Sequence, residues 1–252
     1  MPKDVIRQFV TPQGVTEAVA KDFLARTQAY IKETGTCVVA ISGGRAVNGF
    51  LELLRSPAYL DRIDWENIYF LWTDERFVPQ SSEDNNFHRA KERLFSHISG
   101  CCHFYPVQTE AGTLEEVATL YDKELTTVLS ACEKEAADIL ILGLGDDGHI
   151  ASLFAKSPVL EEQELSVRAV PGGKVWDRVT MTFPFLAKIK DVWFAVVGET
   201  KMAALARVLR QRETYQDDTW QDRIGHVLPG AVLSQDEVRW YVDEAAGGKL
   251  KL

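Results

Sequence analysis

Four short runs of apolar residues recur along the chain, and each run stops at a polar or glycine-rich segment. The runs are Cys37–Ile41, Ile68–Trp72, Asp138–Leu144 and Val192–Val197. Their residues are apolar almost without interruption, which is typical of strands covered on both faces rather than on one. We therefore predict four buried β-strands.

Longer segments between these runs carry apolar residues at helical spacing. They are Val15–Lys32, Asn86–Ile98, Leu114–Cys132 and Met202–Arg212, and we predict a helix over each. Strands that alternate with helices predict an α/β fold with an open, mainly parallel, Rossmann-like sheet and helices on both faces. The charged stretch Gln211–Arg223 is expected to be an exposed loop or helix end.

The composition is that of an ordinary globular protein. Of the 252 residues, 46% are hydrophobic and 26% are charged, and no repeat or low-complexity linker interrupts them, so we predict a single domain over residues 1–252. The net charge of −9 argues against a general nucleic-acid-binding protein, although a few well-placed cations can still hold one phosphate.

Nothing in the sequence predicts a membrane span or a secreted protein. No segment approaches the roughly 18 consecutive apolar residues of a membrane-spanning helix, and the first residues lack the apolar stretch of a signal peptide. The four cysteines form no Cys-x-x-Cys pair. We expect reduced thiols in a cytoplasmic protein that binds neither nucleic acid nor membrane.

Each predicted strand leads directly into a polar or glycine-rich segment. In an open parallel sheet, ligands bind beyond the carboxyl ends of the strands, so we expect an active-site cleft there. The first such segment is Ser42-Gly43-Gly44-Arg45. It could present backbone N–H groups and a helix N-terminus to an anion. A tight strand-to-helix turn without a ligand explains the same residues equally well.

The second segment places Asp74, Glu75 and Arg76 directly after a strand. One interpretation is a solvated loop with weak internal ion pairs. In the other, Arg76 binds a phosphate or carboxylate through both arms of its guanidinium group. Asn85 and Asn86 follow near the same rim, where an asparagine at the start of a helix commonly acts as the N-cap.

The third segment, Gly143–Phe154, is the most specific. A strand ends, glycines free the backbone, and Asp147-Gly148-His149 brings a carboxylate and an imidazole into one loop. Free imidazole titrates near pH ~6.5, so His149 is a candidate general base, with Asp147 as the group that holds its tautomer. The alternative is a structural histidine that caps the loop.

Two further cations stand beside a strand end or a helix start. Singly, Arg178 and Lys201 are interpreted as surface charges. Together with the turn at Ser42 they could form a phosphate pocket.

In this order, the segments resemble the 6-phosphogluconolactonase family, which belongs with the glucosamine-6-phosphate deaminases to one α/β sugar-phosphate superfamily. The shared motifs are a Ser-Gly-Gly turn, Asp-Glu-Arg-x-Val-Pro, Gly-x-Gly-x-Asp-Gly-His-x-Ala-Ser-Leu-Phe, Arg-Val-Thr and Gly-x-x-Lys. They stand at Ser42–Gly44, Asp74–Pro79, Gly143–Phe154, Arg178–Thr180 and Gly198–Lys201. The resemblance spans roughly residues 5–245.

The resemblance implies a deaminase-like fold and hydrolysis of 6-phospho-D-glucono-1,5-lactone, with no redox cofactor and no obligatory metal. It implies that His149 activates water and returns the proton to the departing ring oxygen, while Asp147 orients the imidazole. The substrate- and phosphate-binding residues that it implies are Ser42, Gly43, Gly44, Arg45, Asp74, Arg76, Arg178 and Lys201. The expected partner is the phosphosugar lactone, bound by a monomer or a small homo-oligomer.

The sequence departs from the family pattern in two places. Arg45-Ala46-Val47 follows the Ser-Gly-Gly turn where the family usually has a hydroxyl residue and a proline. Either Arg45 supplies the missing contact by a different geometry, or the phosphate pocket is weaker. Ala155 replaces the usual proline after Phe154, which affects the exit of the loop more than its chemistry.

There are two rival functions, one an enzyme of the same superfamily and the other from a different class. Amino-sugar-phosphate deaminases and isomerases of the superfamily carry a glutamate shortly after the histidine loop, whereas Ser152–Ala155 contains no acid. The other rival is a sugar-phosphate-binding regulator that has lost catalysis. The unusual turn at Arg45 motivates it, and the presence of His149 and Asp147 argues against it.

Overall fold

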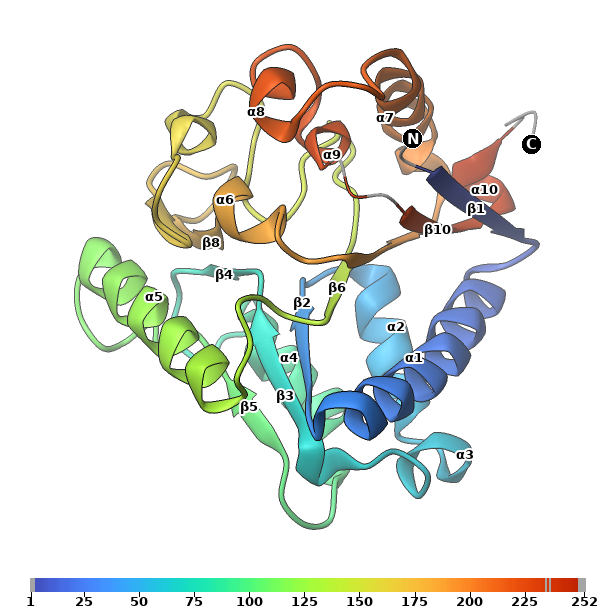
Figure 1. Ribbon diagram of the computed structural model, residues 1–252, viewed down its shortest axis with the longest axis vertical. Coiled ribbons are helices and arrows are strands. Elements are labelled where there is room, and N and C mark those ends of the chain that lie inside the picture. The colour runs from blue at the N-terminus through green and yellow to red at the C-terminus, as the bar shows by residue number, and fades with distance from the viewer. Residues whose placement is uncertain (1–2, 234, 236, 249–252) are drawn as a thin grey trace.

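Seven strands form one sheet in the computed structural model of the protein (Figure 1). The structure describes residues 3–233, 235 and 237–248. Across the sheet the strands are β1 (Lys3–Phe9), β10 (Glu237–Asp243), β9 (Asp191–Val196), β6 (Ile139–Leu142), β2 (Cys37–Ile41), β3 (Ile68–Trp72) and β5 (His103–Tyr105). Every neighbouring pair runs parallel, which confirms the predicted open, mainly parallel sheet.

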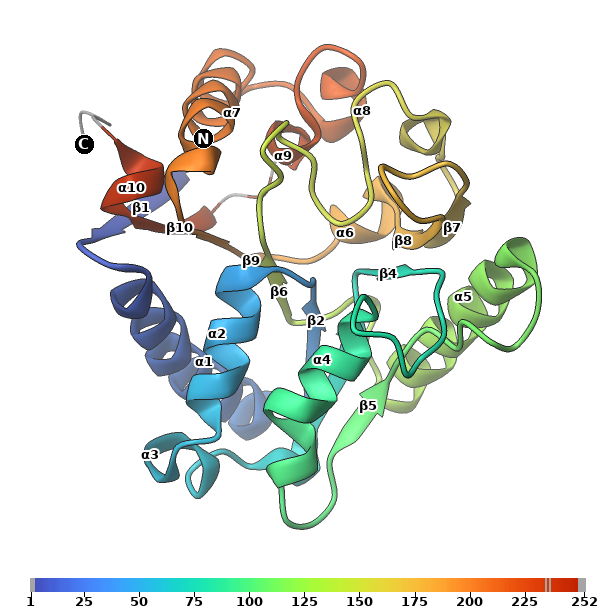
Figure 2. The same cartoon turned by 180° about the vertical axis from the view of Figure 1, so that it is seen from behind.

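A second, smaller sheet was not predicted. It is antiparallel, with strands in the order β4 (Asp74–Arg76), β8 (Arg178–Met181) and β7 (Val167–Val170). Only Thr73 separates β4 from the end of β3, so the small sheet starts directly after β3 (Figure 1). Figure 2 shows β4 near β8 and β7. The position of the small sheet brings residues near 76 and 178 to the edge where ligands are expected.

Helices cover both faces of the main sheet, as predicted. The α-helices are α1 (Pro12–Thr34), α2 (Arg45–Leu54), α3 (Pro57–Leu60), α4 (Asn86–Arg93), α5 (Leu114–Ala131), α6 (Phe183–Leu186), α7 (Met202–Thr214), α8 (Trp220–Arg223), α9 (Pro229–Val232) and α10 (Glu244–Gly247). Helices α1, α2 and α4 pack on one face, and α5, α6, α7 and α9 pack on the other. The apolar core is therefore divided into two clusters by the sheet.

The continuous apolarity of the central strands follows from this arrangement. In β2, Val39 contributes to the cluster with α1 and α2, while its neighbours Val38 and Ala40 contribute to the opposite cluster. Successive side chains of a strand point to opposite faces, and here both faces are buried. A polar residue in the middle of β2 would lie in one core or the other.

Three of the four predicted helices match the structure within a few residues, and one is too long. The predicted helix Asn86–Ile98 ends as α4 at Arg93, and a short 3₁₀ turn follows at Phe95–His97. The backbone of Leu94 leaves the helical region, with φ −136° and ψ −60°. The apolar periodicity continues across this break, which is why the sequence predicts one helix.

The prediction of an exposed segment at Gln211–Arg223 is wrong for its two arginines. Arg212 is 3% exposed and Arg223 is 1% exposed. Nε of Arg212 lies 2.8 Å from Oδ1 of Asp4 in β1, and Arg223 donates to backbone oxygens of Ala231 and Leu233. Both charges can be buried because they have polar partners, which for Arg212 include a carboxylate far away in the sequence and for Arg223 are backbone oxygens of a nearby segment.

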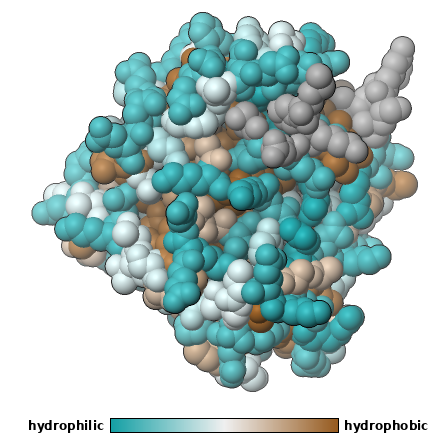
Figure 3. Space-filling model, viewed as in Figure 1, coloured by the Kyte–Doolittle hydropathy of each residue, from teal (hydrophilic) through white to brown (hydrophobic). Residues whose placement is uncertain are grey.

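The described part of the chain contains no helix long and apolar enough to cross a membrane. The face shown in Figure 3 is mostly hydrophilic, and its hydrophobic residues form small, separate groups.

Tyr121 in α5 joins this helix to the end of β3, and its hydroxyl is expected to stabilise the fold. The hydroxyl accepts a hydrogen bond from the backbone N of Trp72 at 2.7 Å and donates one to its backbone O at 2.9 Å. Tyr121→Phe leaves both buried groups unpaired, so it should lower the free energy of unfolding by about 1–3 kcal/mol. Urea unfolding measures this. Tyr59→Phe is the control, because within the described residues the Tyr59 hydroxyl makes no hydrogen bond, and an equal loss in both variants would contradict the prediction.

Candidate active site

A cavity of about 290 Å³ opens at the carboxyl ends of β2, β6 and β9. The loops that follow these strands form its walls, together with β4, β8 and the start of α2. All of the predicted site residues except Asp147 line the cavity: Ser42, Gly43, Gly44, Arg45, Asp74, Arg76, His149, Arg178 and Lys201. Segments distant in the sequence thus converge as expected from the topology of the sheet.

His149 and Asp147 form a pair in the loop after β6. Nδ1 of His149 lies 2.5 Å from Oδ1 of Asp147, and the backbone N of His149 donates to the same oxygen at 3.2 Å. The imidazole also packs against the ring of Phe154, with 4.6 Å between the centroids. Because Nδ1 is occupied by the carboxylate, Nε2 is the nitrogen left to exchange a proton with a ligand or a water.

Gly145 makes room for this pair. A Cβ atom at position 145 would lie 2.0 Å from Nδ1 of His149 and 2.7 Å from Oδ1 of Asp147. Gly148 adopts φ +86°, a conformation that favours glycine, and so reverses the chain between the two side chains. Gly145 is therefore required by the close approach of His149 and Asp147, and Gly148 is favoured by its backbone conformation.

Lys174 is a cavity residue that the sequence analysis missed. Its Nζ lies 2.9 Å from Oδ2 of Asp147. Burial opposes ionisation of Asp147, but hydrogen bonds from Lys174 and His149 outweigh it and hold the pKa of this carboxyl below its ordinary value. The signal in the sequence was a lysine in a Pro-Gly-Gly turn shortly before Arg178.

Arg76 and Arg178 are neighbours across the small sheet. Their Cα atoms are directly paired between β4 and β8. Nη1 of Arg76 donates to the backbone O of Asp84 at 2.8 Å, and its buried Nε has no hydrogen-bond partner among the described residues. Two guanidinium groups side by side repel each other, so an anion bound beside them would be favoured.

Asp74 offsets part of this positive charge. Nη1 of Arg178 lies 3.8 Å from Oδ2 of Asp74, and the hydroxyl of Ser152 donates to the same oxygen at 2.7 Å. Burial lowers the pKa of Arg178, although Asp74 opposes that effect, and a guanidinium remains protonated at neutral pH. Asp74 therefore fixes the position of Arg178 at the cavity wall.

Lys201 and Arg45 lie on other walls of the cavity. Lys201 forms an ion pair with Asp146, and the hydrogen bond from Lys201 lowers the pKa of this carboxyl. Arg45 is exposed at the start of α2, and no hydrogen bond or ion pair of its side chain is found within the described residues. Neither cation is an isolated surface charge away from the site.

The Ser42–Gly44 turn follows β2 and leads into α2, and it is hydrogen-bonded to the segment after β6. The hydroxyl of Ser42 accepts a hydrogen bond from the backbone N of Gly143 at 3.0 Å. A Cβ atom on Gly43 would lie 2.1 Å from Oδ1 of Asn86, and Gly44 adopts φ +121°. No side chain caps the N-terminus of α2, so its first backbone N–H groups remain available to an anion.

The segment at Asp74–Arg76 is not the solvated loop that one interpretation predicted. Glu75 is fully buried, and its carboxyl accepts hydrogen bonds from the backbone N atoms of Arg76, Asn86 and Phe87 at 2.7–3.0 Å. Burial raises the pKa of Glu75 to about 7, against the effect of these donors. Asn85 is the N-cap of α4, as predicted, and accepts from the backbone N of His88.

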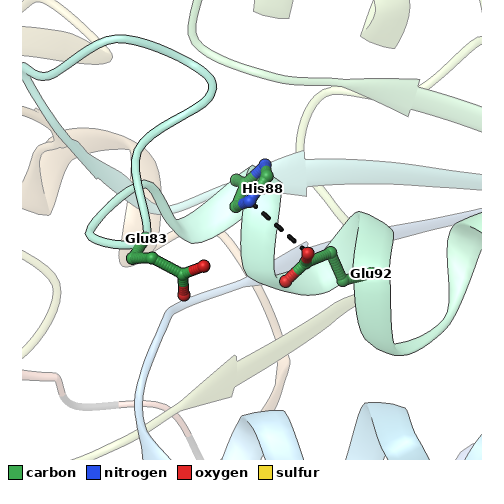
Figure 4. A group of neighbouring side chains, drawn as sticks. All are labelled: Glu83, His88 and Glu92. Carbon is green, nitrogen blue, oxygen red and sulfur yellow. Dashed lines mark ion pairs between the residues drawn. The ribbon is translucent and has the colours of Figure 1, made fainter.

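One group of possible metal ligands lies outside the cavity lining. Side-chain ligand atoms of Glu83, His88 and Glu92 all lie within 4.8 Å of one another (Figure 4). Nε2 of His88 is 3.6 Å from Oε1 of Glu92, one helical turn further along α4. Both glutamates are exposed, and such a surface ion pair needs no metal to explain it.

Comparisons with known proteins show the family to which the chain is similar over nearly its full length. Residues 10–240 match a family model described as glucosamine-6-phosphate isomerases/6-phosphogluconolactonase. The 6-phosphogluconolactonase of Synechocystis sp. is 31% identical, over 96% of this chain and 97% of that protein. The crystal structure of 6-phosphogluconolactonase from Thermotoga maritima is 26% identical and superposes with a TM-score of 0.76, covering 96% of this chain and 100% of that one.

The fold extends to the other branch of the superfamily. A monomeric glucosamine-6-phosphate deaminase superposes with a TM-score of 0.75 at 17% identity, covering 96% of this chain and 98% of that one. The fold alone therefore does not separate the two activities, and residues of the site must do so.

Gly145→Ala is expected to break the contact between His149 and Asp147, because the new methyl group would occupy the space of Nδ1. Long-range ¹⁵N–¹H NMR spectra of the histidine rings should then show that the Nδ1 environment of His149 has changed. Gly143→Ala is the control, since it lies in the same loop, likewise has no positive φ, and a Cβ atom there would meet only the backbone O of Gly43, at an ordinary contact distance of 3.7 Å. An unchanged His149 signal in Gly145→Ala would contradict the steric argument.

Proposed function

The chain belongs to the family of glucosamine-6-phosphate isomerases and 6-phosphogluconolactonases, and we propose that it hydrolyses 6-phospho-D-glucono-1,5-lactone to 6-phosphogluconate. This reaction is the second step of the pentose phosphate pathway. It transfers no electrons, so it requires no redox cofactor. The relatives named 6-phosphogluconolactonase support the proposal across nearly the full length of the chain.

The observation that carries the proposal is an imidazole and several cations that face one cavity. Nδ1 of His149 is held by Asp147, which orients Nε2 as the proton acceptor. Arg76, Arg178 and Lys201 line the same cavity and can hold a phosphate. A phosphosugar lactone needs both functions, because its phosphate must be anchored while its carbonyl is attacked.

In the first step, His149 acts as the general base. Nε2 removes a proton from a water molecule while the water oxygen attacks the lactone carbonyl carbon. The carbonyl π electrons move to oxygen and form a tetrahedral oxyanion. Asp147 remains ionised and stabilises the imidazolium that forms, which is the role of the orienting carboxylate in related triads.

In the second step, the oxyanion collapses and the bond between the carbonyl carbon and the ring oxygen breaks. The imidazolium of His149 returns its proton to the departing ring oxygen, which becomes the hydroxyl of the open chain. The new carboxyl group then loses a proton at neutral pH. Cations of the cavity wall, placed before the substrate arrives, stabilise the oxyanion and the phosphate.

The deaminase alternative lacks a carboxylate at the expected place. The glutamate that follows the histidine loop in that branch has no counterpart in Ser152–Ala155. In this chain Ser152 instead donates a hydrogen bond to Asp74. Turnover of glucosamine-6-phosphate with release of ammonia would overturn the proposed lactonase activity, and binding without turnover of either substrate would favour a regulator.

His149→Ala is expected to reduce kcat for the lactone by about 10²- to 10⁴-fold, because general-base assistance is lost. The measurement uses freshly generated phosphogluconolactone and subtracts spontaneous hydrolysis. His226→Ala, which changes an exposed histidine outside the cavity lining, should keep the parent rate. Circular dichroism checks that both variants fold. A rate near the parent level in His149→Ala would show that the general-base assignment is wrong.

Arg178→Ala and Lys201→Ala are expected to raise KM for the phosphorylated lactone by about tenfold or more, because each removes a charged partner of the phosphate. The effect on unphosphorylated gluconolactone should be much smaller. Arg168→Ala, on the adjacent strand β7 and outside the cavity lining, serves as the matched control. Equal losses for both lactones would overturn the assignment of these cations to phosphate.

A further inference from the structure

The hairpin between β7 and β8 brings a cation to the loop after β6. Residues 171–177 form its tip, and Lys174 extends from this tip to Oδ2 of Asp147. Asp147 therefore has two partners on two oxygens, since Oδ1 is bonded to His149. The three side chains form a row of ammonium, carboxylate and imidazole.

The turn that carries Lys174 is held in place by backbone contacts. Gly172 adopts φ +67°, and its N–H donates to Oδ1 of Asp177 at 2.7 Å. A Cβ atom on Gly173 would lie 2.3 Å from the backbone O of Trp176. The backbone O of Asp177 accepts from the N of Phe77 just after β4, at 2.8 Å. The position of Lys174 is thus set by the fold of the hairpin and not by its side chain alone.

Two other cations of the cavity pair with other carboxylates. Lys201 pairs with Asp146, and Arg178 lies beside Asp74. Among the described residues, Lys174 and His149 are the two groups that form ion pairs with Asp147. The charged residues that face the cavity are Arg45, Asp74, Arg76, Asp146, Lys174, Arg178 and Lys201.

We propose that Lys174 is a positioning residue that acts through Asp147. It holds the carboxylate with Oδ1 toward His149 and offsets part of the negative charge that would otherwise favour the imidazolium form of His149. This inference rests on the proposed role of His149 as general base. Its partner is the carboxylate that also holds His149, whereas Lys201 pairs with Asp146 and Arg178 with Asp74, and this shared carboxylate distinguishes the role of Lys174 from that of a simple substrate contact.

The physical reason is the balance of charge around the imidazole. A carboxylate alone favours the imidazolium form, because opposite charges attract. An ammonium on the far oxygen of the same carboxylate reduces that preference while the hydrogen bond to Nδ1 remains. The pKa of Asp147, held low by Lys174 and His149 against the effect of burial, agrees with a carboxylate that stays ionised between two donors.

The test is the pH dependence of kcat/KM for the phosphorylated lactone in Lys174→Met. The midpoint of the acid limb should move to higher pH by about half a unit. At a pH about one unit below the parent midpoint, kcat/KM should therefore fall roughly threefold. Lys174→Arg should restore the parent profile, because it keeps the charge. Lys188→Met removes an exposed lysine outside the cavity lining and should leave the profile unchanged.

A second measurement does not depend on turnover. The imidazole ¹³C resonance of His149, identified with His149→Ala, should titrate at higher pH in Lys174→Met than in the parent. An unchanged titration would overturn the proposal, as would a raised KM with the acid limb unmoved, which would make Lys174 a substrate contact only. If the parent protein does not hydrolyse the lactone, the proposed function fails, and the NMR titration still decides whether Lys174 acts on His149.

Discussion

The site depends on the parallel register of the central strands, which brings their carboxyl ends to one edge of the sheet. Hydrogen bonds extend this register into the loops, since the N–H of Ser42 donates to Ile141 and that of Thr73 donates to Ile41. The chain is therefore still aligned where the glycine turn and the histidine loop begin. A slip of one residue would move every side chain to the other face and place polar groups in the core.

Close approach of the backbone is the second requirement at this edge. Gly43 lies against Asn86, and Gly145 lies against the pair of His149 and Asp147. At both positions a Cβ atom would overlap a polar side chain of the site. These glycines therefore act through the space that they leave, and a sequence pattern shows their presence without showing which side chains fill that space.

Local patterns predicted the central strands and the loops that follow them, and partners distant in sequence limited the rest. The strands β2 and β3 were predicted with their observed ends, because apolar runs buried on both faces are distinct. β1 lies at the edge of the sheet and shows no continuous apolar run. Arg212 was expected at the surface because its partner Asp4 is about 200 residues away. Lys174 was missed for a similar reason, since its relation to Asp147 depends on how two loops meet.

The charges of the cavity show how an acidic protein could hold the phosphate of the proposed substrate. Lys201, Arg178 and Lys174 each have a carboxylate partner that fixes their position before a ligand arrives. A phosphate would compete with these partners, so each cation would contribute less net binding energy than an unpaired one. Because each side chain is already held in place, it would also lose less conformational entropy on binding. Arg45 makes no such pair within the described residues and stands at the uncapped start of α2. The backbone N–H groups there are left uncapped and could receive an anion, so the proposed phosphate pocket does not depend on a side-chain hydroxyl in this turn.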